Sequence, residues 1–83
     1  MVPLLLLSST ISLALELKTA AVCLIKDGVD PQIVLPQLYT FLDQEAINHP
    51  APGSQAANRM WQEAFQRATP VKCAQILRPI FDL

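Results

Sequence analysis

A stop signal and a start signal for helices stand side by side in the segment DGVDP, residues 27–31, and this feature constrains the fold most. Gly28 can take the left-handed backbone conformation that ends many helices, since it has no Cβ to clash. Asp30 can cap the next helix, and Pro31 fits its first position, where the N–H that proline lacks would be unpaired anyway. The segment predicts a tight corner between two helices, with Val29 filling the space beneath it.

The other helix-breaking residues divide the chain into further helices. The sequence has only two glycines and no run in which polar and apolar residues alternate, so strands are not favoured. We predict an all-α fold with a single domain, a small bundle of about four short helices that begins with a tight helical hairpin. The expected helices are residues 9–26, 31–47 or 36–47, 55–68 and 70–78.

Two prolines limit these predicted helices. Pro36 falls inside the second helix, where it removes a backbone hydrogen bond and disfavours the helical conformation of the preceding residue. Either the helix kinks there, or residues 31–35 form one irregular turn and the main helix begins at Pro36. Pro79 is expected to end the last helix near Leu77 or Arg78.

The first predicted helix is unusually apolar. Five of its side chains form one narrow polar stripe at helical spacing: Ser12, Glu16, Thr19, Cys23 and Lys26. An ordinary surface helix has a wider polar face, so this helix should be buried over most of its circumference. Three short neighbours in so small a chain cannot cover all of it. Two pairs are candidates for the uncovered strip that would meet another chain, Leu13 with Leu17 and Leu15 with Val22.

Composition and charge also point to a protein partner. Of all residues, 52% are hydrophobic, and surplus apolar surface on a small domain usually marks a partner, a membrane or an oligomer. The six basic residues are scattered, whereas nucleic-acid binding requires several cations on one face. A helix-turn-helix interpretation of the corner is disfavoured too, because its second helix contains Pro36 and no basic residue.

Residues that carry catalysis are sparse. His49, the single histidine, stands in the loop-forming segment NHPAPGS, and helical spacing holds no carboxylate or cysteine beside it. Asp43 and Glu45 are too close in sequence to share a helix face. The chain contains no phosphate-binding loop, dinucleotide fingerprint or metal-ligand spacing. We therefore predict that the protein is not an enzyme and binds neither a cofactor nor a metal.

The two cysteines, Cys23 and Cys73, belong to no metal-binding or redox motif. Secreted mini-proteins that depend on disulfides usually carry more cysteines. The sequence favours reduced thiols in an intracellular, cytoplasmic protein, with one long-range disulfide as the alternative. Cys23 is expected to be the more accessible thiol, and Cys73 to be buried as a small apolar residue.

The N-terminal segment MVPLLLLSSTISLALE leaves a second alternative open. It resembles the apolar core of a signal peptide, but no positive charge precedes it. A membrane-spanning helix needs about 20 apolar residues, and any such window here includes Glu16 and Lys18. We favour a helix of the domain itself. The alternative is a small exported or membrane-associated protein that uses residues 1–15 as its signal or anchor.

Trp61 on the third predicted helix has two interpretations. It can anchor the core of the bundle, which is favoured because the apolar stripe around it has the width of a core-facing stripe. It can also be a hot spot of an interface, where tryptophan is enriched.

The corner segment AAVCLIKDGVDPQ, residues 20–32, resembles the corresponding corner of the MOZART family. The residues that carry the resemblance are Val22, Leu24, Gly28, Val29, Asp30, Pro31 and Gln32. Members of that family are small helical subunits of gamma-tubulin complexes that wrap around extended helices of larger partners. The resemblance therefore implies a small complex subunit with a helical partner.

These observations predict a non-catalytic interaction module that buries an apolar face against a protein partner or against a second copy of itself. The candidate interface residues are Leu13, Leu15, Leu17, Val22 and Trp61. Nucleic acid is not expected as a partner, and a membrane is disfavoured.

Overall fold

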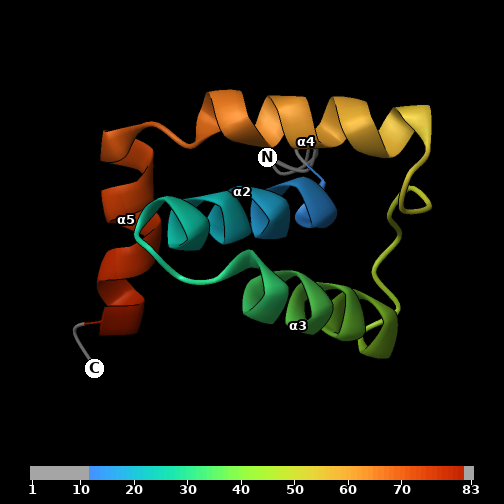
Figure 1. Ribbon diagram of the computed structural model, residues 1–83, viewed down its shortest axis with the longest axis horizontal. Coiled ribbons are helices and arrows are strands. Elements are labelled where there is room, and N and C mark those ends of the chain that lie inside the picture. Colours follow the sequence, from blue (N-terminus) through green and yellow to red (C-terminus); the bar gives the residue numbers. More distant parts are fainter. Residues whose placement is uncertain (1–11, 82–83) are drawn as a thin grey trace, which may run out of the picture.

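The computed structural model describes residues 12–81, and their side chains as far as Arg78. This part of the chain forms four helices: α2 (Leu13–Lys26), α3 (Pro31–Gln44), α4 (Gln55–Arg67) and α5 (Pro70–Phe81). It contains no strand, so the predicted all-α bundle with an early hairpin is confirmed (Figure 1). Helix α2 begins at Leu13 with the extended residue Ser12 as its N-cap, which corrects the expected helix start at Ser9. Most of the segment considered as a signal or anchor lies outside the described residues.

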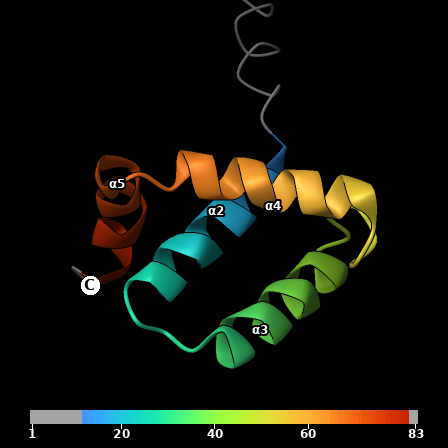
Figure 2. The same cartoon turned by 45° about the horizontal axis from the view of Figure 1, so that its top comes forward.

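Helix α2 lies at the centre of the bundle. Helices α3 and α4 lie along two different sides of it, and α5 crosses near the end of α2 that leads into the corner (Figures 1 and 2). Each outer helix packs mainly against α2, while the three outer helices have few contacts with one another. The expectation that the first helix is buried over most of its circumference is therefore confirmed.

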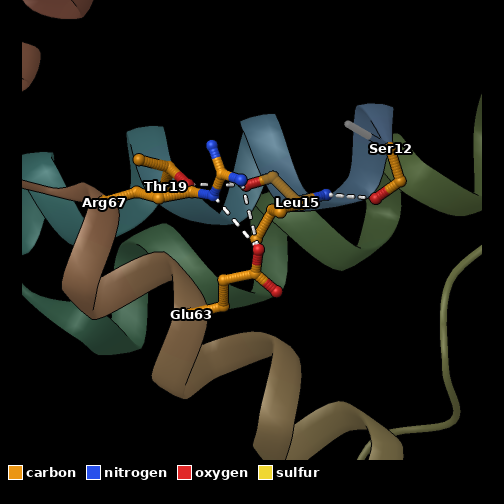
Figure 3. Close-up of polar contacts among 5 residues, drawn as sticks. All are labelled: Ser12, Leu15, Thr19, Glu63 and Arg67. Carbon is orange, nitrogen blue, oxygen red and sulfur yellow. Dashed lines mark hydrogen bonds and ion pairs between the residues drawn. The ribbon is translucent and has the colours of Figure 1, made fainter. Parts of the chain in front are cut away.

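The narrow polar stripe of α2 is not its solvent face. Thr19 and Cys23 are each only 1% exposed. Thr19 is tolerated inside because its Oγ1 donates a hydrogen bond to the carbonyl oxygen of Leu15, at 2.8 Å, within the same helix (Figure 3). At the start of α2, Ser12 supplies the N-cap and accepts the N–H of Leu15 at 3.0 Å.

The corner after α2 forms as predicted. Gly28 has a φ of +103°. The N–H groups of Gly28 and Val29 donate to the carbonyl oxygens of Ile25 and Leu24, both at 3.0 Å, which is the hydrogen-bond pattern of a Schellman motif. Val29 packs against the apolar cluster beneath the corner. Asp30 then caps α3 by accepting a backbone N–H at 2.9 Å.

Gly28→Val should lower the free energy of unfolding by roughly 1 kcal/mol or more, because a β-branched residue resists a positive φ. A Cβ at this position would meet no atom within 4 Å, so the loss comes from the backbone alone. Denaturant unfolding measures the change. An unchanged midpoint would contradict the left-handed conformation of Gly28.

The end of α3 offers the reverse test. Ala46 has a φ of +53° at the position equivalent to Gly28, and the N–H of Ile47 donates to the carbonyl oxygen of Leu42 at 2.9 Å. Ala46→Gly should therefore raise the free energy of unfolding by about 1 kcal/mol, since it removes the Cβ penalty. A loss of stability in the same denaturant assay would show that Ala46 is not strained.

Both internal prolines lie within continuous helix. Helix α3 passes unbroken through Pro36 and ends before the expected residue 47, so the irregular-turn alternative is wrong. Helix α5 continues beyond Pro79, which corrects its expected end. A proline deprives the carbonyl four residues earlier of its donor. Those carbonyls belong to Gln32 and Gln75, which lie on exposed helix faces where water can replace the lost bond.

The core consists of two clusters that both include α2. In the α3 cluster, the buried residues are Ala14, Ala21, Val34, Leu38 and Leu42. In the α5 cluster, they are Leu15, Val22, Cys23, Ala64, Ala68 and Leu77.

On the surface of α4, Arg67 donates two hydrogen bonds to Glu63 Oε2, from Nε at 3.3 Å and from Nη2 at 3.2 Å (Figure 3). This is the expected pairing of residues four apart on a helix.

Candidate functional site

An open apolar groove of about 300 Å³ runs between α2 and α3. It is lined by Leu17, Ala20, Ala21, Leu24, Val29, Ile33, Val34, Gln37, Leu38 and Phe41. Gln37 is the single polar residue of this lining, and no charged residue belongs to it. The groove can therefore recognise an apolar surface, but it offers no electrostatic recognition.

Large apolar side chains border the groove and face solvent. Ile33 and Phe41 are 54% and 45% exposed, and they lie two helical turns apart on the same face of α3. Leu13 is 58% exposed and lies one turn before Leu17 on α2. Exposed apolar side chains that gather in one patch are typical of interaction sites.

The predicted interface residues divide between this surface and the core. Leu13 is exposed, and Leu17 is half-buried and lines the groove. Leu15 and Val22 are buried in the α5 cluster, so they are core residues and the second candidate pair does not form an exposed strip. The reason is that α4 and α5 cover their side of α2. Trp61 is half-buried and packs against both core clusters, in agreement with the favoured core interpretation.

A buried lysine joins α2 to α3 and α4. Lys18 is 0% exposed, and its Nζ has no hydrogen-bond partner among the described residues. The Nζ lies 4.7 Å from the ring centroid of Trp61 and 5.5 Å from that of Tyr39. Trp61 Nε1 donates a hydrogen bond to Tyr39 Oη at 3.2 Å, which links the two rings. Cation–π attraction to both rings therefore holds the ammonium group.

Sequence reasoning missed this cluster, although a signal was present. Lys18 lies off the polar stripe of a helix that is expected to be buried, so its charge needs a partner inside the protein. Aromatic faces are one such partner for a cation. The sequence does not show which aromatic residues the fold brings to Lys18.

Cys23 and Cys73 form a disulfide, with a Cα–Cα distance of 5.3 Å. The expectation of reduced thiols is therefore wrong, and the alternative of one long-range bridge is correct. Cys23 is also not the accessible cysteine, since it is 1% exposed, whereas Cys73 is half-buried. The packing of α5 across the end of α2 brings the two cysteines together, and their spacing alone could not reveal it.

A pocket of about 550 Å³ opens beside this bridge, and we call it the disulfide pocket. It is lined by Cys23, Lys26, Asp27, Ala68, Pro70, Cys73, Ala74, Leu77 and Arg78. Lys26 Nζ donates to the carbonyl oxygen of Ala68 at 2.9 Å, which satisfies the end of α4. Both cysteines of the bridge therefore border an open pocket that is also lined by two basic side chains.

His49 is more enclosed than a solvated loop residue. Its Nε2 lies 3.1 Å from Asp43 Oδ1, its Nδ1 lies 3.1 Å from the carbonyl oxygen of Pro50, and its ring centroid lies 5.7 Å from that of Tyr39. The loop thus brings a carboxylate beside His49 that helical spacing did not predict. Among the described side chains, no group of three or more His, Cys, Asp or Glu residues is arranged to hold a metal ion.

Within the described part of the chain, no helix has the length and apolar character needed to cross a membrane. The chain matches no protein-family model, no curated protein and no solved structure.

Proposed function

We propose that this protein is a non-catalytic interaction module that binds the apolar face of a partner helix in the groove between α2 and α3. The observation that supports this most is the exposure of Ile33 and Phe41 beside an uncharged groove. Fully burying a side chain of this size contributes about 1.5–3 kcal/mol, and Ile33 and Phe41 each have about half of their surface left to bury. Together they can contribute about 1.5–3 kcal/mol to the binding of a partner.

The lining of the groove defines the chemistry of the partner. A charged side chain placed there would lose water without gaining an opposite charge, so the partner presents an uncharged apolar strip. Two helices already form the walls, and the side chains of a third helix can interdigitate between them. The side-chain amide of Gln37 offers an NH2 group as donor and a carbonyl oxygen as acceptor within the groove, and these groups can set the register of that helix.

The resemblance of the corner to the MOZART family agrees with a helical partner and stays a prediction. A second copy of this chain is the other occupant that the sequence leaves open. The experiment below distinguishes the two.

Phe41→Glu should weaken partner binding by about tenfold or more and leave the fold intact, because Phe41 is already 45% exposed in the free protein. Phe65→Glu is the matched control, since Phe65 lies on α4, is 55% exposed and does not line the groove. A photoreactive amino acid in place of Gln37, introduced in the native cells, should form a cross-link to the protein that occupies the groove. The same photoreactive amino acid in place of the exposed Gln66 is the control.

A cross-linked product specific to position 37, lost in Phe41→Glu and retained in Phe65→Glu, supports the proposal. A product that consists of two copies of this chain identifies a homodimer. Equal cross-linking from both positions, or equal sensitivity to both glutamate variants, would contradict a binding groove between α2 and α3.

The disulfide favours export, which is one part of the alternative that the protein is exported or membrane-associated. Disulfides persist in oxidising compartments and are rare in the cytosol. An oxidised Cys23–Cys73 bridge thus supports an exported interaction module over a cytoplasmic one. The intact mass of the protein from its native source tests this point: a shortened N-terminus with oxidised cysteines supports export, and a full N-terminus with two free thiols supports the cytoplasm.

A further inference from the structure

We propose that the disulfide pocket is a site of thiol–disulfide exchange, at which an external anionic thiol attacks Cys73 and thereby releases α5. This site lies apart from the groove between α2 and α3, and it does not depend on the function proposed for that groove. The reactant is a small thiol of the glutathione class.

The two cysteine residues of the bridge differ in exposure. Cys23 is 1% exposed within the α5 cluster, whereas Cys73 is half-buried, and both border the disulfide pocket of about 550 Å³. The rate of thiol–disulfide exchange depends on access and on which sulfur is attacked. The pocket therefore directs an incoming thiolate to Cys73 and leaves Cys23 as the departing sulfur.

The charges around the pocket favour an anionic reactant. Lys26 and Arg78 line it together with one acidic residue, Asp27. Lys26 is engaged by the carbonyl oxygen of Ala68, so exposed Arg78 is the cation that is freer to meet a carboxylate of the incoming thiol. Cationic surroundings also favour the thiolate form, which is the nucleophile.

The reaction balances with the thiol as the sole reductant. An electron pair of the external thiolate forms a bond to Cys73 Sγ, the Cys23–Cys73 bond breaks, and Cys23 leaves as a thiolate that takes a proton from water. A second thiolate then attacks the external sulfur of the mixed disulfide and releases Cys73. Two external thiols become one external disulfide, and the two electrons that they lose reduce the bridge of the protein.

Helix α5 depends on the bridge for its position. It packs mainly against α2, and Leu77, at 8% exposed, is the one buried residue among its described side chains. Two residues, Ala68 and Thr69, connect it to α4. Without the bridge, α5 should leave its site and uncover the α5 cluster, including Leu15 and Val22.

Hydrogen exchange of the full chain, measured by mass spectrometry before and after treatment with reduced glutathione, tests this release. The backbone amides of α5 should exchange at least tenfold faster after reduction, while those of α2, α3 and α4 keep their protection. Retained protection of α5 with both thiols free would overturn the proposal. Loss of protection in all four helices would overturn it as well, because the bridge would then stabilise the whole fold without controlling α5.

The position and charge dependence of the attack are tested on the same protein. Peptide mapping after quenching with acid should find the glutathione adduct on Cys73; an adduct mainly on Cys23 would overturn the assignment.

Arg78→Glu should slow reduction by glutathione severalfold and leave reduction by uncharged 2-mercaptoethanol unchanged. Arg59→Glu makes the same charge change outside the pocket, and equal slowing in both variants would overturn the role of the pocket.

Discussion

Reduction of the Cys23–Cys73 bridge should lower the free energy of unfolding by up to about 4 kcal/mol, because the bridge closes a long loop in the unfolded chain. The two cysteines are 50 residues apart. The loss is large for a small domain, since folded proteins are stable by only about 5–15 kcal/mol. Urea unfolding of the oxidised and reduced protein measures it, and an unchanged midpoint would show that the bridge contributes nothing to stability.

Cys23→Ala/Cys73→Ala is the control for this experiment, because its stability should not respond to reductant. The slope of the unfolding free energy against urea provides a separate readout, since it scales with the surface exposed on unfolding. If α5 has already left its site in the reduced protein, that slope should be smaller than for the oxidised protein. An equal slope with a lower midpoint would show that α5 still unfolds together with the rest.

Lys18→Met should raise the free energy of unfolding by about 1 kcal/mol or more. Methionine has nearly the same length and keeps the contacts of the aliphatic stem, but it carries no charge into the core. The effective cost of burying an ion is several kcal/mol. The desolvated contact with the Trp61 ring, at 4.7 Å, returns about 2 kcal/mol, and the Tyr39 ring lies farther away at 5.5 Å and returns less. Thermal unfolding compares the two proteins; a clear loss of stability would show that the rings more than offset the burial of the ammonium group.

A double-mutant cycle with Trp61 isolates the contact itself. Trp61→Leu should lower the free energy of unfolding by about 2 kcal/mol more in the wild-type background than in the Lys18→Met background. In the wild-type background, the substitution also removes the nearest ring from a buried cation. Both backgrounds lose the same buried ring area and the same hydrogen bond to Tyr39. Equal losses in the two backgrounds would contradict a cation–π interaction.

The parts of the fold that depend on short-range chemistry were predictable. The corner forms as expected because Gly28 and Asp30 satisfy neighbouring backbone groups, and this requires no knowledge of the other helices. The irregular turn considered at Pro36 and the helix end expected before Pro79 are wrong for a related reason. The cost of Pro36 depends on whether the carbonyl that loses its donor can reach water, and that depends on which face of α3 is outside.

The sequence predicted that the candidate interface lies on α2, but not which of two residue pairs on that helix forms it, because tertiary packing decides this. The apolar circumference of α2 indicated an uncovered strip, but Leu13 with Leu17 and Leu15 with Val22 fit that description equally well. The positions of α4 and α5 decide between them, and they cover the second pair. The disulfide and the cluster around Lys18 depend on the same long-range packing, so no local pattern in the sequence shows which residues meet there.

The central position of α2 has a consequence for how sites in this protein influence one another. The groove and the disulfide pocket lie on different outer helices that have few direct contacts, so any energetic coupling between them passes through α2. Substitutions confined to the outward faces of α3 and α5 should then combine additively. Either surface can accumulate changes in specificity without disturbing the other, whereas a substitution that shifts α2 acts on both surfaces at once.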